Sequence, residues 1–348
     1  MKLLQRFLSC SISVSIISGI CSFDVFAHEN SAHDLIPHIV ECTLNEENMG
    51  EVLTVHDLLN YDDNRIAQCY DCENGYIIID NDNNIIEYSP TADSPYINCY
   101  DKTYYAGPLE YYIEKEENYQ HIFDEYLELS YDELKDVSKA FDDNIEYNTF
   151  NANIEDEILP AATGQYYDTK LKYEPRCLDY NTQGTCGSLA ATILLFYYYD
   201  HIDSAYLSSE WRNNPSGLHD YLINHIEIRG NQGDLMGSSV ASLRSGLAFA
   251  LPMISNLKRD SVTVCDDTTP PSGIWNHSSY LINGVNVPYL LLINNHPLYK
   301  NHWVLGYGIS QLRDGSNMLN RFFIVNDGWG NNNVRIAYGF ATGMVYLD

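Results

Sequence analysis

The sequence predicts an α+β fold in two parts. Three observations support this: the charge changes abruptly near residue 160, a long apolar helical pattern begins at Cys186, and short β patterns fill the end of the chain. Residues 28–160 contain 32 Asp+Glu and 5 Lys+Arg, whereas residues 161–348 contain 15 and 12. Such a shift indicates a domain boundary, and residues 151–165 have the polar, proline-containing composition of a linker.

The first 27 residues have the pattern of a secretory signal peptide. Lys2 and Arg6 precede an apolar run, and the small residues Val25 and Ala27 fit cleavage after Ala27. We therefore expect a secreted protein, extracellular or associated with the cell surface, that is not inserted in a membrane once the signal is removed. With 48 Asp+Glu against 19 Lys+Arg, the chain is a polyanion, which disfavours nucleic acid as a partner.

The acidic residues 28–160 carry the patterns of a folded domain. The stretch "GYIIIDNDNNIIEYS" predicts two strands, Tyr76–Asp80 and Ile85–Tyr88, joined by a turn of Asn and Asp. Apolar residues at helical spacing predict an amphipathic helix within residues 126–147. We expect a small α+β domain in which acid or salt relieves the repulsion between carboxylates.

Seven cysteines remain after the signal peptide. They are Cys42, Cys69, Cys72, Cys99, Cys177, Cys186 and Cys265. Because seven is odd, at least one thiol has no disulfide partner within the chain. The spacing of "CYDC" would suit half a zinc site or a redox pair, but no second pair follows at a suitable distance. We therefore expect no metal.

The motif "GTCGSLAA" places Cys186 at the predicted start of a buried helix, with Thr185 as its N-cap. Unpaired N–H groups and the helix dipole favour a thiolate at this position, and the thiolate is the nucleophilic form of cysteine. The same N–H groups stabilise the oxyanion of an acyl-transfer intermediate. The alternative is a structural thiol, or a disulfide with Cys177.

Two later motifs supply the partners that a nucleophilic thiol needs. "NHWVLGYGI" begins a predicted strand with His302, and "FIVNDGWG" ends a predicted strand at Asn326 and Asp327. A thiol on a helix, an imidazole on a strand and a carboxylate or amide at a strand end are a nucleophile, a base and an orienting group. Further strands are predicted at "YLLLINN", "VRIAYGF" and "GMVYLD".

The motifs "CGSLAATILLFYYYD", "NHWVLGYG" and "VNDGWG" resemble those of papain-superfamily cysteine peptidases, in particular streptopain-like and bacteriocin-processing enzymes. The predicted strand pair and the Tyr-rich segment that follows it, "YYAGPLEYY" at Tyr104–Tyr112, resemble the propeptide of streptopain-like zymogens. The resemblance implies a papain-like domain at 161–348, with the cysteine on a central helix and the histidine and aspartate on an antiparallel sheet. It also implies a propeptide at 28–160, a protein or peptide substrate, the chain's own propeptide as a partner, and no cofactor.

The resemblance implies that Cys186 is the nucleophile and His302 the general base and acid. Matching Trp329-Gly330 to the tryptophan-glycine pair of papain favours Asp327 as the residue that orients His302, with Asn326 as the alternative. The glutamine that papain-type enzymes carry six residues before the nucleophile is absent, because Tyr180 stands there. The candidate oxyanion donors are therefore Gln183 and Asn181.

Two other functions fit the same motifs. If Gln183 in "QGTCGS" is matched to the papain glutamine that lies six residues before the nucleophile, the nucleophile position falls on Leu189. The chain would then be a non-catalytic pseudopeptidase that binds other molecules. We favour Cys186, because Leu189 lies on the apolar stripe of the predicted helix. The other possibility is a different Cys-His-Asp acyl-transfer enzyme, such as a transglutaminase-like enzyme or a peptidoglycan amidase.

Overall fold

The computed structural model describes residues 36–125, 127–148, 164–178, 184–229, 237–258, 261–293 and 302–348. The predicted signal peptide, Asn181, Gln183 and all but the last two residues of the predicted linker at 151–165 lie outside these residues; the linker's last residue, Gln165, begins a strand. Residues Pro37–Asp348 form one compact unit. Within it, we refer to residues 37–148 as the N-terminal half and to residues 164–348 as the C-terminal half.

The N-terminal half contains two helices and eight strands among its described residues. In order they are α1 (His38–Glu46), β1 (Val52–Leu59), β2 (Arg65–Cys72), β3 (Tyr76–Asp80), β4 (Ile85–Ser89), β5 (Thr103–Tyr105), β6 (Tyr111–Lys115), β7 (Asn118–His121), β8 (Glu128–Leu129) and α2 (Tyr131–Asn148). The predicted strand pair is β3 and β4. Helix α2 begins at Tyr131 because Ser130 and Glu133 form a reciprocal cap, in which each side chain accepts a hydrogen bond from the other's main-chain N–H.

The C-terminal half contains the predicted helix at Cys186 and, after it, the predicted strands. In order its elements are β9 (Gln165–Lys170), α3 (Cys186–His201), η1 (Ser204–Tyr206), α4 (Pro215–Ile226), α5 (Val240–Ile254), β10 (Val264–Asp267), α6 (Pro271–Tyr280), η2 (Leu281–Val285), β11 (Tyr289–Ile293), β12 (His302–Asp314), β13 (Asn317–Asn326), β14 (Val334–Ala337), η3 (Tyr338–Phe340) and β15 (Ala341–Leu347). The fold class is therefore α+β, as the sequence predicts.

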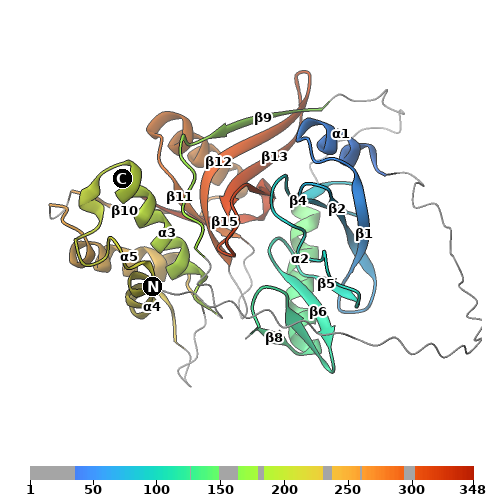
Figure 1. The fold of residues 1–348 in the computed structure, drawn as a ribbon, viewed down its shortest axis with the longest axis horizontal. Helices are drawn as coiled ribbons and strands as arrows, with labels where there is room; N and C mark the ends of the chain where they lie inside the picture. The colour runs from blue at the N-terminus through green and yellow to red at the C-terminus, as the bar shows by residue number, and fades with distance from the viewer. Residues whose placement is uncertain are drawn as a thin grey trace, which may run out of the picture. The chain divides into compact units, whose positions relative to one another are not determined.

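Helix α3 starts at Cys186 and lies against β11 and β12 (Figure 1). Every residue from Cys186 to Tyr198 is buried, so the helix is apolar on all its faces. Thr185 occupies the N-cap position as predicted, but its side chain makes no capping hydrogen bond. The hydroxyl of Ser188 instead donates to the main-chain oxygen of Thr185 at 2.9 Å.

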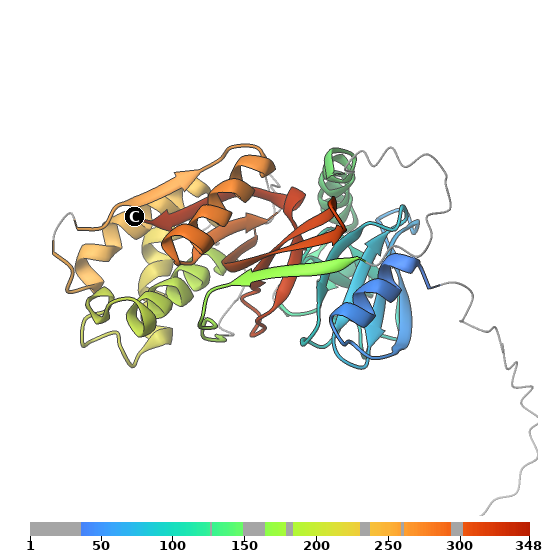
Figure 2. The same cartoon turned by 90° about the horizontal axis from the view of Figure 1, so that it is seen from above.

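One continuous sheet joins the two halves among the described residues. Its strand order is β10-β15-β11-β12-β13-β14-β4-β3-β2-β1-β5-β6-β7-β8, and β9 pairs with β12 (Figures 1 and 2). The junction is the antiparallel pairing of β14 with β4, in which Arg335 lies opposite Tyr88 and Ile336 opposite Glu87. The N-terminal half therefore extends the C-terminal sheet by main-chain pairing.

A buried arginine reinforces this junction. The guanidinium of Arg335 on β14 donates to Asp168 on β9 at 2.6 Å and lies 3.3 Å from the carboxylate of Glu47, which follows α1. It also lies over the ring of Tyr88 on β4, 5.1 Å from the ring centroid, and the Tyr88 hydroxyl donates to Glu47 at 3.0 Å. Arg335 is 2 % exposed, so its buried charge depends on these two partly exposed carboxylates.

We expect Arg335→Met to lower the free energy of unfolding by about 3 kcal/mol, since it leaves the carboxylates of Glu47 and Asp168 without their cation. Urea unfolding measures this loss. The matched control is Arg244→Met, which removes the more exposed ion pair with Asp266 and should cost much less. Equal losses in the two variants would contradict the assignment of Arg335 as the anchor between the halves.

Candidate active site

Cys186 is the first residue of α3 and its side chain is nearly closed off from solvent. The residue is 8 % exposed. Burial, together with the negative charges of Glu227 and Glu110, raises the pKa of the thiol to about 12. Main-chain hydrogen bonds from Trp303 and Gly187 act in the opposite direction. In this covered state the thiol is therefore protonated at neutral pH.

His302 is the first residue of β12, directly before the Trp303 whose main chain contacts the thiol. Its Nε2 donates to the main-chain oxygen of Asp327 at 2.9 Å. Burial lowers the pKa of the imidazole to about 4, although the bond to Asp327 opposes that shift. His302 is thus neutral, and with its proton on Nε2 the ring presents Nδ1 as an acceptor.

The structure differs from the expected role of the Asp327 and Asn326 side chains. The Asp327 carboxylate accepts hydrogen bonds from Trp329 N at 2.7 Å, Asn331 N at 2.9 Å and Asn331 Nδ2 at 2.8 Å. The Asn326 amide bonds Gly328 N and Asn332 Oδ1. Both side chains are used by their own turn, so the main-chain carbonyl of Asp327 holds His302 in their place.

Trp329 links His302 to the N-terminal half. Its ring stacks on His302 with a centroid distance of 5.6 Å and an interplanar angle of 17°. The same ring lies 5.3 Å from the ring of His121 and 5.9 Å from that of Phe123. We call His121, Phe123 and Trp329 the aromatic cover. Through Trp329, two rings of the N-terminal half are thus connected to the imidazole.

A loop of the N-terminal half brings a carboxylate near the thiol. Glu110 is 3 % exposed, and its charge is one of those that raise the pKa of Cys186. The loop is held by Leu109, whose N–H donates to the buried Glu87 carboxylate at 3.0 Å and whose carbonyl accepts from His121 Nε2 at 3.2 Å. Leu109 has φ +67°, a left-handed conformation that a branched side chain adopts only when its surroundings impose it.

The first turn of α3 is the described part of the predicted oxyanion site. Asn181 and Gln183, the predicted side-chain donors, lie outside the described residues. In this turn, the main-chain N–H of Gly187 bonds the thiol and that of Ser188 bonds the carboxylate of Glu227. The residues that sequence reasoning missed here are Glu110, Glu227, His121 and Phe123, all of which reach the site through tertiary contacts.

Neither metal-binding nor membrane-spanning features occur in the described part of the chain. No three His, Cys, Asp or Glu side chains there are grouped to hold a metal ion. No helix there combines the length and apolarity that crossing a bilayer requires. The seven described cysteines, Cys186 included, are all thiols rather than disulfides.

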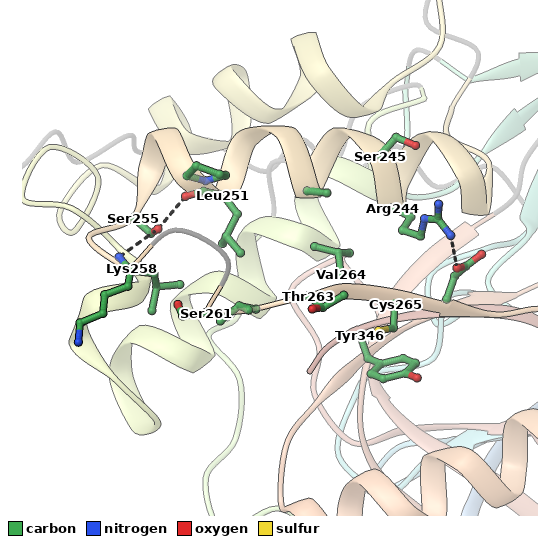
Figure 3. A pocket seen from close by; sticks show the side chains of 15 residues that line it. Arg244, Ser245, Leu251, Ser255, Lys258, Ser261, Thr263, Val264, Cys265 and Tyr346 are labelled. Carbon is green, nitrogen blue, oxygen red and sulfur yellow. Dashed lines mark hydrogen bonds and ion pairs between the residues drawn. The ribbon is translucent and has the colours of Figure 1, made fainter.

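A separate pocket of about 890 Å³ lies in the C-terminal half between α5, β10 and β15. Arg244 and Lys258 lie at opposite ends of it, and Tyr346 and Cys265 form part of its floor (Figure 3). Its lining residues include none of the predicted catalytic residues. Arg244 is already paired with Asp266 at 2.7 Å. This pocket is therefore not the site of the predicted chemistry.

Comparison with known proteins places the chain in no established family. No protein-family model matches it, and no curated protein matches its sequence. Among solved structures, it is similar to that of a fragment of Prevotella intermedia prointerpain A, with a TM-score of 0.42 and 12 % sequence identity over 84 % of this chain and 98 % of that one. A TM-score this low supports no inference about fold or function.

We expect Glu87→Gln to change how stability depends on pH. Burial raises the pKa of Glu87 from 4.5 to about 7, so the folded protein holds this proton more tightly than the unfolded chain does. That contribution to stability is complete below about pH 4.5 and is lost as the pH rises through 7. Relative to the glutamine variant, wild type should lose on the order of 3 kcal/mol between pH 4.5 and pH 8. Urea unfolding at the two pH values measures it, and a difference that stays constant would contradict it.

Proposed function

We propose that this chain is a secreted cysteine peptidase made as a zymogen, with a papain-like C-terminal half and an N-terminal half that acts as a propeptide. Cys186 is the nucleophile and His302 the general base and acid. The substrate is a protein or peptide.

The observation that supports this proposal is the covered thiol–imidazole site. Cys186 starts a buried helix, its thiol contacts the residue next to His302, and His302 is held by a main-chain carbonyl. A nucleophile, a base and helical N–H groups are what acyl transfer requires. Glu110 and the aromatic cover bring residues of the N-terminal half to the same site, which is the arrangement we propose for a zymogen.

The proposed reaction begins when His302 Nδ1 takes the proton of Cys186. The thiolate attacks the peptide carbonyl, a C–S bond forms, and the oxyanion is stabilised by N–H groups at the start of α3. His302 then gives its proton to the amine, and the C–N bond breaks. Water attacks the thioester, passes a proton to His302, and releases the carboxylic acid and the thiol.

The covered state opposes the first of these steps. A thiol whose pKa is raised to about 12 beside an imidazole whose pKa is lowered to about 4 does not form an ion pair. Burial is the first cause of both shifts, so removing the N-terminal half and admitting water would move both pKa values back toward their ordinary range. Activation would thus consist of uncovering the pair.

We expect purified wild-type protein to cleave itself between the two halves under reducing conditions and Cys186→Ala to stay whole. Intact-mass analysis over time measures the loss of about the first 160 residues. The matched control is Cys265→Ala, which removes a thiol that lines the separate pocket and should cleave like wild type.

Three results would count against this proposal. If wild type stays whole and Cys186 resists iodoacetamide, the pseudopeptidase becomes the better account. If an uncovered protein transfers acyl groups to an amine, or cuts cell-wall peptides but no protein, the chain is a different acyl-transfer enzyme. Cleavage of Cys186→Ala at the wild-type rate would remove Cys186 from the mechanism.

We expect His121→Ala combined with Phe123→Ala to speed up alkylation of Cys186, because both rings pack on Trp329 above His302. Iodoacetamide labelling followed by peptide mapping measures the rate. The control is Tyr100→Ala, which removes a ring that is 96 % exposed. An unchanged rate in the double variant would mean that the aromatic cover does not close the site.

A further inference from the structure

Glu227 contacts the first turn of the helix that carries Cys186. It directly follows α4, and one carboxyl oxygen, Oε1, accepts from Ser188 N at 2.7 Å and from Ser188 Oγ at 2.8 Å. Glu227 is 8 % exposed. A side chain from a different helix thus satisfies a free N–H at the start of α3, two residues after the nucleophile.

Close packing fixes the same turn. A Cβ atom on Gly187 would lie 1.9 Å from Ser238 Oγ and 3.3 Å from Glu227 Oε1. Only glycine therefore fits between Cys186 and Ser188 while Glu227 and Ser238 keep their places. From the other side of the turn, the His219 side chain bonds the main chain of Thr185. The position of Cys186 is set by these contacts.

The charge of Glu227 competes with a thiolate. The N-terminus of a helix stabilises a nearby anion, and at α3 this position is already taken by a carboxylate. Among the charged side chains, Glu227 raises the pKa of Cys186 the most. Burial raises the pKa of Glu227 itself to about 7, although its bonds to Ser188 oppose that shift.

We propose that Glu227 is a positioning residue for the nucleophile: its carboxyl group fixes the first turn of α3, and its negative charge holds back formation of the Cys186 thiolate. This inference rests on the proposed role of Cys186. Protonated Glu227 keeps an oxygen for the Ser188 bonds and loses its charge, so it restrains the thiolate only at neutral and alkaline pH.

The other titratable side chains near this turn are the same residues in wild type and in the variant Glu227→Gln. Glu110 from the N-terminal half and His302 from β12 lie on the thiol side, and His219 from α4 lies on the side of Thr185. None of them is altered by a change at Glu227. A difference between wild type and Glu227→Gln therefore reports on the Glu227 charge.

The test measures the rate of Cys186 alkylation by iodoacetamide in the full chain, by peptide mapping, at pH 6 and pH 9. Glu227→Gln keeps an oxygen for Ser188 and should react like wild type at pH 6 and about tenfold faster at pH 9, the effect of one pKa unit on the thiol. Glu227→Ala should perturb the rate at both pH values, because it also loses the Ser188 bonds. Asp80→Asn, which neutralises a buried carboxylate on β3 that is not among the main charges acting on the thiol, should match wild type at both.

A rate ratio for Glu227→Gln that is the same at pH 6 and pH 9, or that falls at pH 9, would overturn the proposal. Wild type alone gives a second test should the variant not fold. Its alkylation rate should rise less than tenfold per pH unit near pH 7, where Glu227 ionises, and a tenfold rise throughout would also overturn the proposal. Neither readout needs turnover, so failure of self-cleavage would leave this inference standing.

Discussion

The exclusion of water from Cys186 and His302 is the constraint on which the rest of this structure depends. Both residues are at most 8 % exposed, and burial keeps the thiol protonated and the imidazole neutral. Glu110 and the aromatic cover bring residues of the N-terminal half to this site. The hold of the N-terminal half on the C-terminal half comes from β4–β14 pairing and from Arg335, so the chemistry of the site is coupled to the junction of the sheet.

Local patterns in the sequence predict most of the elements but not how the halves join. Helix α3 and strands β3, β4 and β11–β15 appear where periodicity placed them, because each pattern reflects burial along a short segment. The pairing of β14 with β4 leaves no local signal, since partners almost 250 residues apart have ordinary strand sequences. Arg335 likewise has no distinctive local pattern, because its partners Glu47, Asp168 and Tyr88 come from distant segments of the chain.

The candidate site divides in the same way. Cys186 and His302 could be found because a helix start and a strand start leave recognisable motifs. The sequence also predicts that the Asp327 carboxylate orients His302. In the structure this carboxylate instead accepts hydrogen bonds from Trp329 N and Asn331 N of its own turn. Glu110 and Glu227 could not be found, because each reaches the thiol from a distant segment, and the acidic composition offers many equivalent carboxylates.

The most direct test of this account is labelling of the reduced, incubated protein with an epoxysuccinyl peptide, a reagent that a thiolate opens with help from a neighbouring imidazolium. Peptide mapping then identifies the modified cysteine. The account predicts modification at Cys186 alone, and none in His302→Ala. Modification of the exposed Cys177 instead, or equal labelling of Cys186 with and without His302, would contradict it.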